Sequence, residues 1–188
     1  MVELKSSGIS AGRVGDEDKA ALGKKIVDVA LLRGDFVLSS GEPSNFYFDK
    51  YLFETRPELL AHIADFLAER VPENVNMLAG PELGGVALAT ALSLRTGLPF
   101  VIVRKQSKDY ATGRIIEGRL EKTDRVLVVE DVVSTGAESI RSARRIAEFG
   151  ATVIGVLAVL DREQGGAQNV KDAGFSFDAV YRRSELNM

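Results

Sequence analysis

The sequence predicts an α/β fold: a mostly parallel central sheet flanked by helices, with a small N-terminal hood subdomain over one edge. From residue 77 onward, short apolar segments alternate with segments of helical length and periodicity. Such alternation is typical of βαβ units with right-handed crossovers, which give parallel sheets covered on both faces. Roughly the first 50 residues break this pattern and are rich in aromatic and turn residues. With 188 residues, the chain is long enough for one sizeable core and short for two.

The N-terminal region is expected to form a tail followed by the hood. Residues 1–17 are rich in Ser and Gly and lack the hydrophobic core of a signal peptide, so we expect a flexible tail. Residues 18–188 are then expected to form one domain. In it, the hood takes up residues 18–55, approximately, together with the C-terminal segment.

Local patterns assign the elements of the hood. Asp18 is a candidate N-cap for a helix over residues 19–32, which Gly34 ends. Turn residues then separate two short strand-like segments, 36–38 and 46–49.

The remaining elements follow from apolar periodicity. Residues 57–70 form an amphipathic helix with Pro57 in its first turn. The alternating region predicts, in chain order, a strand at 77–79, a helix ending at Thr96, a strand at 100–103, a loop or hairpin at 104–119, a strand at 125–129, a helix at 136–149 and strands at 152–159 and 175–181.

Composition and charge exclude several classes of function. The net charge of −3 and the pI near 5.4 give no electrostatic footprint for nucleic acid. No apolar segment is long enough to cross a membrane. The absence of cysteine excludes disulfides and thiol chemistry and agrees with a cytoplasmic protein. His62 is the only histidine and lies on the predicted 57–70 helix, so histidine-based acid–base chemistry is not expected.

The strongest local pattern lies in residues 125–139, R-V-L-V-V-E-D-V-V-S-T-G-A-E-S. A buried strand ends in two adjacent acids, Glu130 and Asp131, and a turn of small residues then opens a helix. The N–H groups at a helix N-terminus suit a phosphate, and the two acids suit the hydroxyls of a ribose. The alternative is a plain capped strand–helix junction. We favour a ligand site because unpaired carboxylates at the tip of an apolar strand are costly to bury.

The run V-V-E-D-V-V-S-T-G, residues 128–136, resembles the signature of the type I phosphoribosyltransferases, which bind 5-phosphoribosyl 1-diphosphate (PRPP). The resemblance implies that the two acids hold the ribose hydroxyls and that the loop amides hold the 5-phosphate. The PRPP-binding residues that it implies are Glu130, Asp131, Val132, Val133, Ser134, Thr135, Gly136, Ala137, Glu138, Arg104, Lys105, Lys108 and Tyr110.

Further segments narrow the resemblance to the orotate phosphoribosyltransferases, over nearly the whole chain after the tail. They are F-V-L-S-S-G at 36–41 with N-F-Y-F-D at 45–49, G-P-E-L-G-G at 80–85, R-K-Q-S-K-D-Y at 104–110 and L-D-R-E-Q-G-G at 160–166. In that family they correspond to a base-covering segment, a pyrophosphate loop, a mobile catalytic loop and an element with a base-binding arginine. The resemblance therefore assigns Glu82, Leu83 and Gly84 to the pyrophosphate loop.

The chemistry of orotate agrees with the expected base site. Orotate is a flat anion, so it needs aromatic walls and a fixed cation. Tyr47 and Phe48 can supply a wall, Arg162 can supply a fork of donors, and Ser134 is expected to help hold the base. Plain core packing of the two aromatic residues and a surface role for Arg162 are the alternatives.

Catalysis is expected to depend on cations around the departing pyrophosphate. The resemblance implies that Arg104, Lys105 and Lys108, with Asp131 at the ribose, are the catalytic residues. The alternative for this loop is a solvated basic turn. Mg²⁺ is the implied cofactor, held through PRPP with no direct protein ligand. Because the catalytic loop crosses a dimer interface in the family, a homodimer with shared active sites is also implied.

The sequence departs from the family pattern at several positions. Ser39 and Gly84 stand where some members have lysine, and Tyr110 stands where many have histidine. Glu138 places an acid where a small residue is usual, and it would repel a phosphate if it pointed inward.

These departures leave two alternative functions open. One is a phosphoribosyltransferase for another base, against which the retained Arg162 argues. The other is a non-catalytic regulator that senses PRPP or a nucleotide. Lys105 and Lys108 argue against it, because a sensor has no use for cations aimed at a leaving group.

Overall fold

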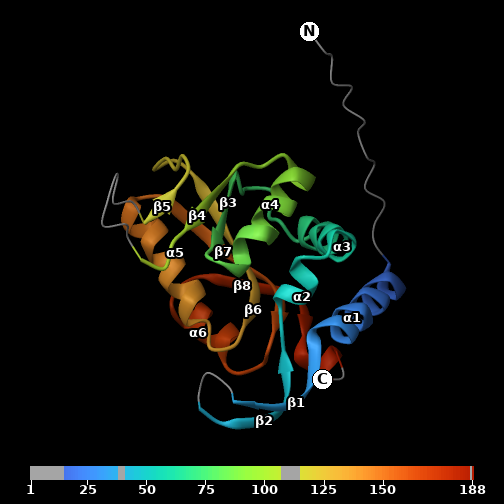
Figure 1. The fold of residues 1–188 in the computed structure, drawn as a ribbon. Coiled ribbons are helices and arrows are strands. Elements are labelled where there is room, and N and C mark those ends of the chain that lie inside the picture. The colour runs from blue at the N-terminus through green and yellow to red at the C-terminus, as the bar shows by residue number, and fades with distance from the viewer. Residues whose placement is uncertain (1–14, 38–40, 107–114, 187) are drawn as a thin grey trace.

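The computed structural model describes residues 15–37, 41–106, 115–186 and 188. Its centre is a six-stranded sheet with the strand order β5-β4-β3-β6-β7-β8 (Figure 1). The strands are β3 (Met77–Pro81), β4 (Phe100–Val103), β5 (Ile116–Glu117), β6 (Arg125–Val133), β7 (Thr152–Asp161) and β8 (Ser176–Arg182). Neighbouring strands are parallel except β4 and β5, which pair antiparallel at one edge. The predicted α/β fold with a mostly parallel sheet is confirmed.

Helices cover both faces of the sheet (Figure 1). One face carries α3 (Pro57–Ala68) and α4 (Gly84–Thr96), with α1 (Asp16–Ala30) packed against α3, and the other carries α5 (Ala137–Phe149) and α6 (Gly166–Asp172). The core has two parts because successive side chains of a strand point to opposite faces. Leu127 and Val129 of β6 belong to the cluster beneath α3 and α4, whereas Val126 and Val128 belong to the cluster beneath α5.

The connections reverse direction between β3 and β6. The chain leaves β3 through α4 toward β4, and it leaves β6 through α5 toward β7 on the opposite side of the sheet. The carboxyl ends of β3 and β6 therefore diverge into two different loops. In open parallel sheets such a switch point is where ligands bind.

A two-stranded antiparallel hairpin lies below the sheet in Figure 1. It consists of β1 (Leu31–Val37) and β2 (Pro43–Phe48), and the short helix α2 (Tyr51–Glu54) follows it. Helix α1 ends at Ala30, earlier than the predicted 19–32 helix. Residues 31 and 32 extend instead, because they pair with Phe48 and Tyr47. Gly34, expected to end the helix, has a φ of 155° and lies inside β1 at an irregular register.

Other predicted boundaries also differ from the observed ones. Strand β6 continues to Val133, four residues beyond the predicted end, because its far end pairs with Leu160 and Asp161 of β7. Helix α6 and the 3-10 turn η1 (Arg183–Glu185) were not predicted. Within the described part of the chain, no helix combines the length and apolarity that a membrane crossing needs.

Candidate active site

A cavity of about 390 Å³, here called the strand-end cavity, opens at the switch point between β3 and β6. Three stretches of chain line it together with Lys105: residues 50–51, 81–84 and 130–139. It therefore brings together the two acids, the small-residue turn and the G-P-E-L-G-G loop. The cavity is negatively charged overall. Among its described lining residues four bear carboxyl groups (Glu82, Glu130, Asp131 and Glu138) and two bear ammonium groups (Lys50 and Lys105).

Glu130 and Asp131 are both buried at the end of β6, with exposed fractions of 7% and 2%. They face different neighbours because adjacent strand residues point to opposite sides. Glu130 accepts a hydrogen bond from Ser139 Oγ at 3.3 Å. Burial, followed by the charge of Asp131, raises the pKa of Glu130 to about 8. Asp131 Oδ1 accepts a hydrogen bond from the N–H of Val132 at 2.5 Å.

Lys50 is a site residue that the sequence analysis missed. Its Nζ lies 2.6 Å from Asp131 Oδ2. Burial alone would lower the pKa of Lys50, but the charge of Asp131 and the hydrogen bond to it outweigh burial, so the pKa is raised. Sequence patterns gave little sign of this lysine, since it precedes a four-residue helix and comes close to Asp131 only in the folded chain.

Glu54 is a second missed residue, buried behind this ion pair with an exposed fraction of 3%. Burial, then the charge of Asp131 and a hydrogen bond with it, raise the pKa of Glu54 to about 9. Glu54 is therefore protonated at neutral pH. A neutral carboxyl in this place adds no further negative charge to the cavity.

The turn between β6 and α5 lines one part of the cavity. Among the described residues, the backbone N–H groups of Ser134, Thr135 and Gly136 have no hydrogen-bond acceptor. Gly136 has a φ of 78°, and a Cβ there would lie 3.1 Å from the carbonyl oxygen of Gly166, so glycine suits the position on both counts. Val132 and Val133 line the cavity too, although they belong to β6 and not to the turn.

Glu138 does not present an unpaired charge to this turn. Its carboxylate lies 2.8 Å from Arg141, one helical turn away, and its side chain is half exposed. The side chain also follows the helix-dipole preference for an acid in the first turn. The repulsion expected from an inward-pointing acid is therefore reduced by the ion pair.

The base of the expected catalytic loop is held by α5. Arg145 donates hydrogen bonds to the carbonyl oxygens of Arg104 and Lys105, the latter at 2.9 Å. Lys105 lines the strand-end cavity. Arg104 instead lies 3.9 Å from Glu117 and is not among the residues that line it. Lys108 and Tyr110 fall outside the described residues, as does Ser39.

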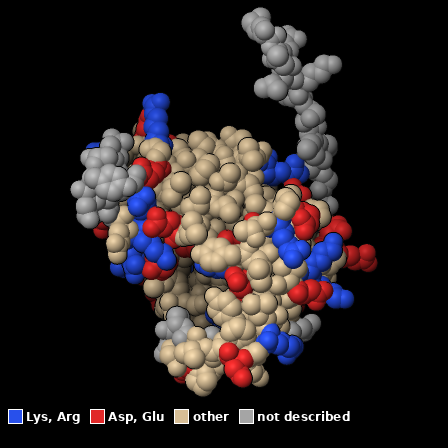
Figure 2. Space-filling view, viewed as in Figure 1, with Lys and Arg blue, Asp and Glu red and all other residues tan. Residues whose placement is uncertain are grey.

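A second cavity, of about 930 Å³ and here called the hairpin cavity, lies between the β1–β2 hairpin and the ends of β6 and β7. Figure 2 shows the surface hollowed between the hairpin, at the bottom of the view, and the body of the molecule. All four residues expected at the base line this cavity: Tyr47, Phe48, Ser134 and Arg162. Ser134 and Thr135 line both cavities, so the two adjoin at this turn.

Arg162 enters the hairpin cavity as a half-buried cation. Burial, and then the charge of Arg183, lower its pKa. Among the described residues no carboxylate forms an ion pair with Arg162. The carboxylate of Glu163, the next residue, accepts hydrogen bonds from Ser184 instead. Tyr47 also stacks toward Phe36, with ring centroids 5.7 Å apart. The cavity thus combines aromatic surface with a cation that lacks an anionic partner in this part of the protein.

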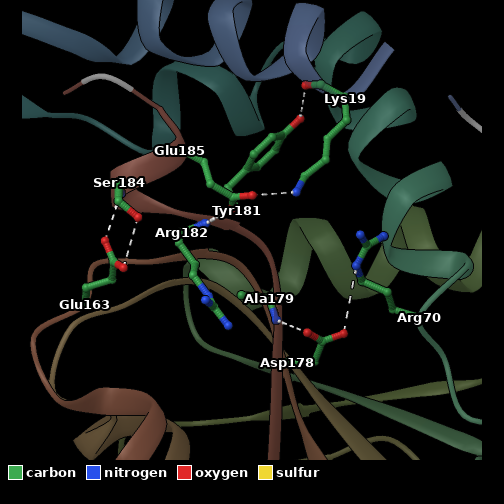
Figure 3. Close-up of polar contacts among 9 residues, drawn as sticks. All are labelled: Lys19, Arg70, Glu163, Asp178, Ala179, Tyr181, Arg182, Ser184 and Glu185. Atoms are coloured by element: carbon green, nitrogen blue, oxygen red, sulfur yellow. Dashed lines mark hydrogen bonds and ion pairs between the residues drawn. The ribbon is translucent and has the colours of Figure 1, made fainter. Parts of the chain in front are cut away.

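The C-terminal turn η1 contacts both the loop after β7 and helix α1 (Figure 3). On one side, the Glu163 carboxylate accepts hydrogen bonds from Ser184 N at 2.8 Å and Ser184 Oγ at 3.0 Å. On the other, Glu185 lies 3.1 Å from Lys19 of α1, which leads directly into the hairpin. Tyr181 OH donates to the carbonyl oxygen of Lys19 at 2.8 Å.

Comparison with known proteins agrees with this geometry. Residues 53–182 match the family described as the phosphoribosyl transferase domain. The orotate phosphoribosyltransferase of Pyrococcus horikoshii is 47% identical over 156 residues, which cover 81% of this chain and 84% of that protein. The orotate phosphoribosyltransferase of Halobacterium salinarum is 45% identical over 81% of this chain and 87% of its own.

Solved structures of orotate phosphoribosyltransferases are also similar to this chain. The orotate phosphoribosyltransferase of Mycobacterium tuberculosis, in complex with Fe(III) dicitrate, superimposes with a TM-score of 0.82 at 29% identity. It covers 91% of this chain and 99% of that one. The same protein in complex with PRPP superimposes with a TM-score of 0.78 at 28% identity over 91% of this chain. The fold, the placement of the acids and these relatives agree that the chain belongs to the phosphoribosyltransferase family, among the orotate phosphoribosyltransferases.

Proposed function

We propose that the strand-end cavity binds PRPP, that the hairpin cavity binds orotate, and that the reaction takes place where the two meet. The chain is an enzyme that transfers ribose 5-phosphate to orotate, giving orotidine 5′-phosphate and pyrophosphate, a step in making UMP. In the reaction, the bond from C1 of the ribose to the diphosphate breaks and N1 of orotate bonds to C1, losing its proton. The observation that carries this proposal is the shared lining of the two cavities at Ser134 and Thr135.

The ribose 5-phosphate is assigned to the end of β6 and the start of α5. Glu130 and Asp131 accept hydrogen bonds from the ribose hydroxyls. The 5-phosphate is bound by the N–H groups of residues 134–138, which lie at a helix N-terminus. This assignment is supported by the amides of Ser134, Thr135 and Gly136, which have no acceptor within the described residues. Val132 and Val133 form the wall beneath the sugar.

The departing pyrophosphate is assigned to Glu82, Leu83 and Gly84 and to the cations that face them. Lys105 is the described loop cation on the cavity. We retain Arg104, Lys108 and Tyr110 as further contributors on the strength of the family resemblance. For Arg104 this requires that its side chain leave Glu117. A cation aimed at the leaving oxygen stabilises charge that grows in the transition state, which is the interaction that raises the rate.

Magnesium is proposed to enter bound to PRPP. The described residues contain no cluster of three or more His, Cys, Asp or Glu side chains that could hold a metal by themselves. The strand-end cavity nevertheless carries twice as many carboxyl as ammonium groups, which suits a divalent cation arriving with a polyanionic substrate. When bound, Mg²⁺ would offset negative charge on the diphosphate.

Orotate is assigned to the hairpin cavity. Arg162 pairs with its carboxylate or a ring carbonyl, Tyr47 and Phe48 contact its ring, and Ser134 lies at its ribose side. This assignment is supported by the partially buried guanidinium of Arg162, for which a ligand anion would supply the missing partner. An uncharged base would leave that guanidinium unpaired.

A cytoplasmic homodimer is proposed as the working form. Helix α4 presents an uncharged outer side, and Figure 2 shows few charged side chains over it. Leu94 of α4 is 84% exposed and Leu83, just before the helix, is 65% exposed. Such apolar exposure suits a subunit interface. Light scattering should give a dimer mass for the native chain and a monomer mass for Leu94→Glu; an unchanged dimer with this variant removes α4 from the interface.

The test of the function is a steady-state assay of the purified protein with PRPP, Mg²⁺ and a panel of bases. We expect pyrophosphate release with orotate and far less with uracil, adenine, guanine or hypoxanthine. Release with a purine instead would favour a different base specificity. PRPP binding in calorimetry without release for any base would favour a non-catalytic sensor.

A further inference from the structure

We infer that Lys50 is a substrate-binding cation: it binds the diphosphate of PRPP when the ribose hydroxyls take over its present partner, Asp131. The inference rests on the proposed function and adds to it a residue that neither the sequence pattern nor the family resemblance assigns. Lys50 comes from the segment between the hairpin and α2, and it reaches the strand-end cavity from the side of the Glu82–Gly84 loop.

The first observation is the place that Lys50 occupies. A Cβ added to Gly84 would lie 1.5 Å from Asp131 Oδ2 and 3.2 Å from Lys50 Nζ. No side chain therefore fits at position 84 while Asp131 stays where it is. The pyrophosphate loop cannot supply a cation from position 84, and the Lys50 ammonium lies beside the point where such a side chain would begin.

The second observation is that the ammonium is free to turn toward a ligand. Asp131 is almost fully buried, but the Lys50 side chain is 35% exposed. Of the two Asp131 oxygens, Oδ1 is already used by the N–H of Val132, so a ribose hydroxyl that binds Oδ2 competes directly with Lys50. Oδ2 is the oxygen that a substrate hydroxyl would find at the surface of the carboxylate facing Lys50 and Gly84.

The third observation is that the groups beside Lys50 compete only weakly for the released ammonium. The Tyr51 ring centroid lies 5.4 Å from Lys50 Nζ, and the pKa of Glu130 is raised to about 8. Glu54 lies beside the pair, but its raised pKa keeps it neutral near pH 7. Its Oε1 is buried without a hydrogen-bond partner in the described structure. The diphosphate, with several negative charges, is then the strongest partner available to Lys50. Binding of the sugar and binding of the diphosphate are thereby coupled through one lysine.

The test compares Lys50→Met with Lys24→Met, the same substitution on the exposed surface of α1. We expect Lys50→Met to raise the KM for PRPP and the inhibition constant of pyrophosphate about tenfold, since charge-assisted hydrogen bonds are the strong ones. The KM for orotate should stay within about twofold of the native value. Ribose 5-phosphate should bind at least as tightly as to the native chain, because it no longer competes with Lys50 for Asp131. Lys50→Arg should recover most of the loss, and Lys24→Met should change nothing.

Two outcomes overturn the inference. If pyrophosphate, added with ribose 5-phosphate bound, binds Lys50→Met as tightly as the native chain, Lys50 does not contact the diphosphate. If Lys50→Met weakens the binding of ribose 5-phosphate as much as the binding of pyrophosphate, Lys50 only holds Asp131 in place. Lys50→Gln, which keeps a hydrogen-bond donor to Asp131 without a charge, replaces Lys50→Met if the latter does not fold. Calorimetry with pyrophosphate and ribose 5-phosphate needs no turnover, so it decides the role of Lys50 even if the native chain proves inactive on orotate.

Discussion

The strand-end cavity and the hairpin cavity adjoin at one turn but are constructed differently. The strand-end cavity is made largely from one contiguous stretch, residues 130–139, at the end of the mostly buried strand β6. The hairpin cavity is assembled from the hairpin, the end of β6 and the loop after β7. The loop after β7 is joined to the C-terminal turn by hydrogen bonds between exposed residues, those of Ser184 to Glu163.

This difference separates the chemistry of the reaction from the recognition of the base. Charges act strongly where water is excluded, so the buried acids and Lys50 fix the sugar and the leaving group with large energies. Each exposed hydrogen bond contributes less to stability than a buried one, so the base-binding half is held in place by several weak interactions. We therefore expect substitutions in the strand-end cavity to reduce catalysis severely, and those in the hairpin cavity to change orotate binding selectively.

The largest effect is expected for Asp131→Asn. The substitution keeps the shape but removes the charge that pairs with Lys50 and faces the ribose. We expect kcat/KM for PRPP to fall by roughly 10²- to 10³-fold, in the range seen when one aimed polar group is removed from an active site. Steady-state kinetics measures this, with Asp178→Asn as the control, since Asp178 is an exposed residue of β8 that lies 3.9 Å from Arg70. Nearly native kinetics for Asp131→Asn would show that Asp131 does not bind the ribose.

A smaller and more selective effect is expected for Arg162→Ala. It removes the partially buried cation of the hairpin cavity. The KM for orotate should rise by about 10- to 100-fold, because the lost hydrogen bonds involve a charged group, while the KM for PRPP stays nearly unchanged. The exposed Arg119, whose side chain is 89% exposed, gives the matched control Arg119→Ala. If both Michaelis constants rise together, the two cavities are not separable in the way described above.

The strand-end cavity was the more predictable half from sequence. Glu130, Asp131 and the turn at 134–136 are neighbours in the chain, so their chemistry could be recognised from local pattern and strand burial alone. The length of β6 could not be predicted from the local pattern. Its continuation to Val133 depends on pairing with Leu160 and Asp161, which a local pattern does not contain. Lys50 was missed for the same reason, because folding alone brings it to Asp131.

The hairpin cavity shows more clearly what local sequence patterns cannot predict. Its residues Tyr47, Phe48 and Arg162 were named from the resemblance and from the chemistry of a flat anion, not from any local pattern that joins them. Gly34 was interpreted as a helix stop, although the pairing of β1 with β2 makes it part of a strand. The contacts of Glu163 with Ser184 join segments whose proximity depends on how β7 and β8 pack side by side.

A pH-dependent effect on stability should arise in the strand-end cavity. The folded protein raises the pKa of Glu130 from 4.5 to about 8. Between these values the folded chain binds a proton that the unfolded chain has lost, so the stability contributed by neutral Glu130 is greatest at low pH and falls as pH rises toward 8. Glu130→Gln removes this dependence. Thermal unfolding at several pH values should show the variant gaining on the native chain from pH 5 to pH 8, and a constant difference would contradict the shift.

The smallest effect is expected for Glu163→Gly, which tests whether the C-terminal turn sets the position of Arg162. Glu163 has a φ of 56°, a left-handed conformation that glycine adopts without strain, so the substitution removes the carboxylate while favouring the same backbone. Without the two hydrogen bonds from Ser184, the loop that carries Arg162 loses its attachment to the turn, although the Glu163 N–H still donates to Asp161 at 2.9 Å. We expect the KM for orotate to rise about fivefold with kcat and the KM for PRPP unchanged, in line with the modest net value of exposed hydrogen bonds. Ser184→Ala, which removes one of the two donors, should give a smaller rise in the same direction. A crystal structure of Glu163→Gly with Arg162 unmoved, together with an unchanged KM for orotate, would show that the sheet alone places the arginine.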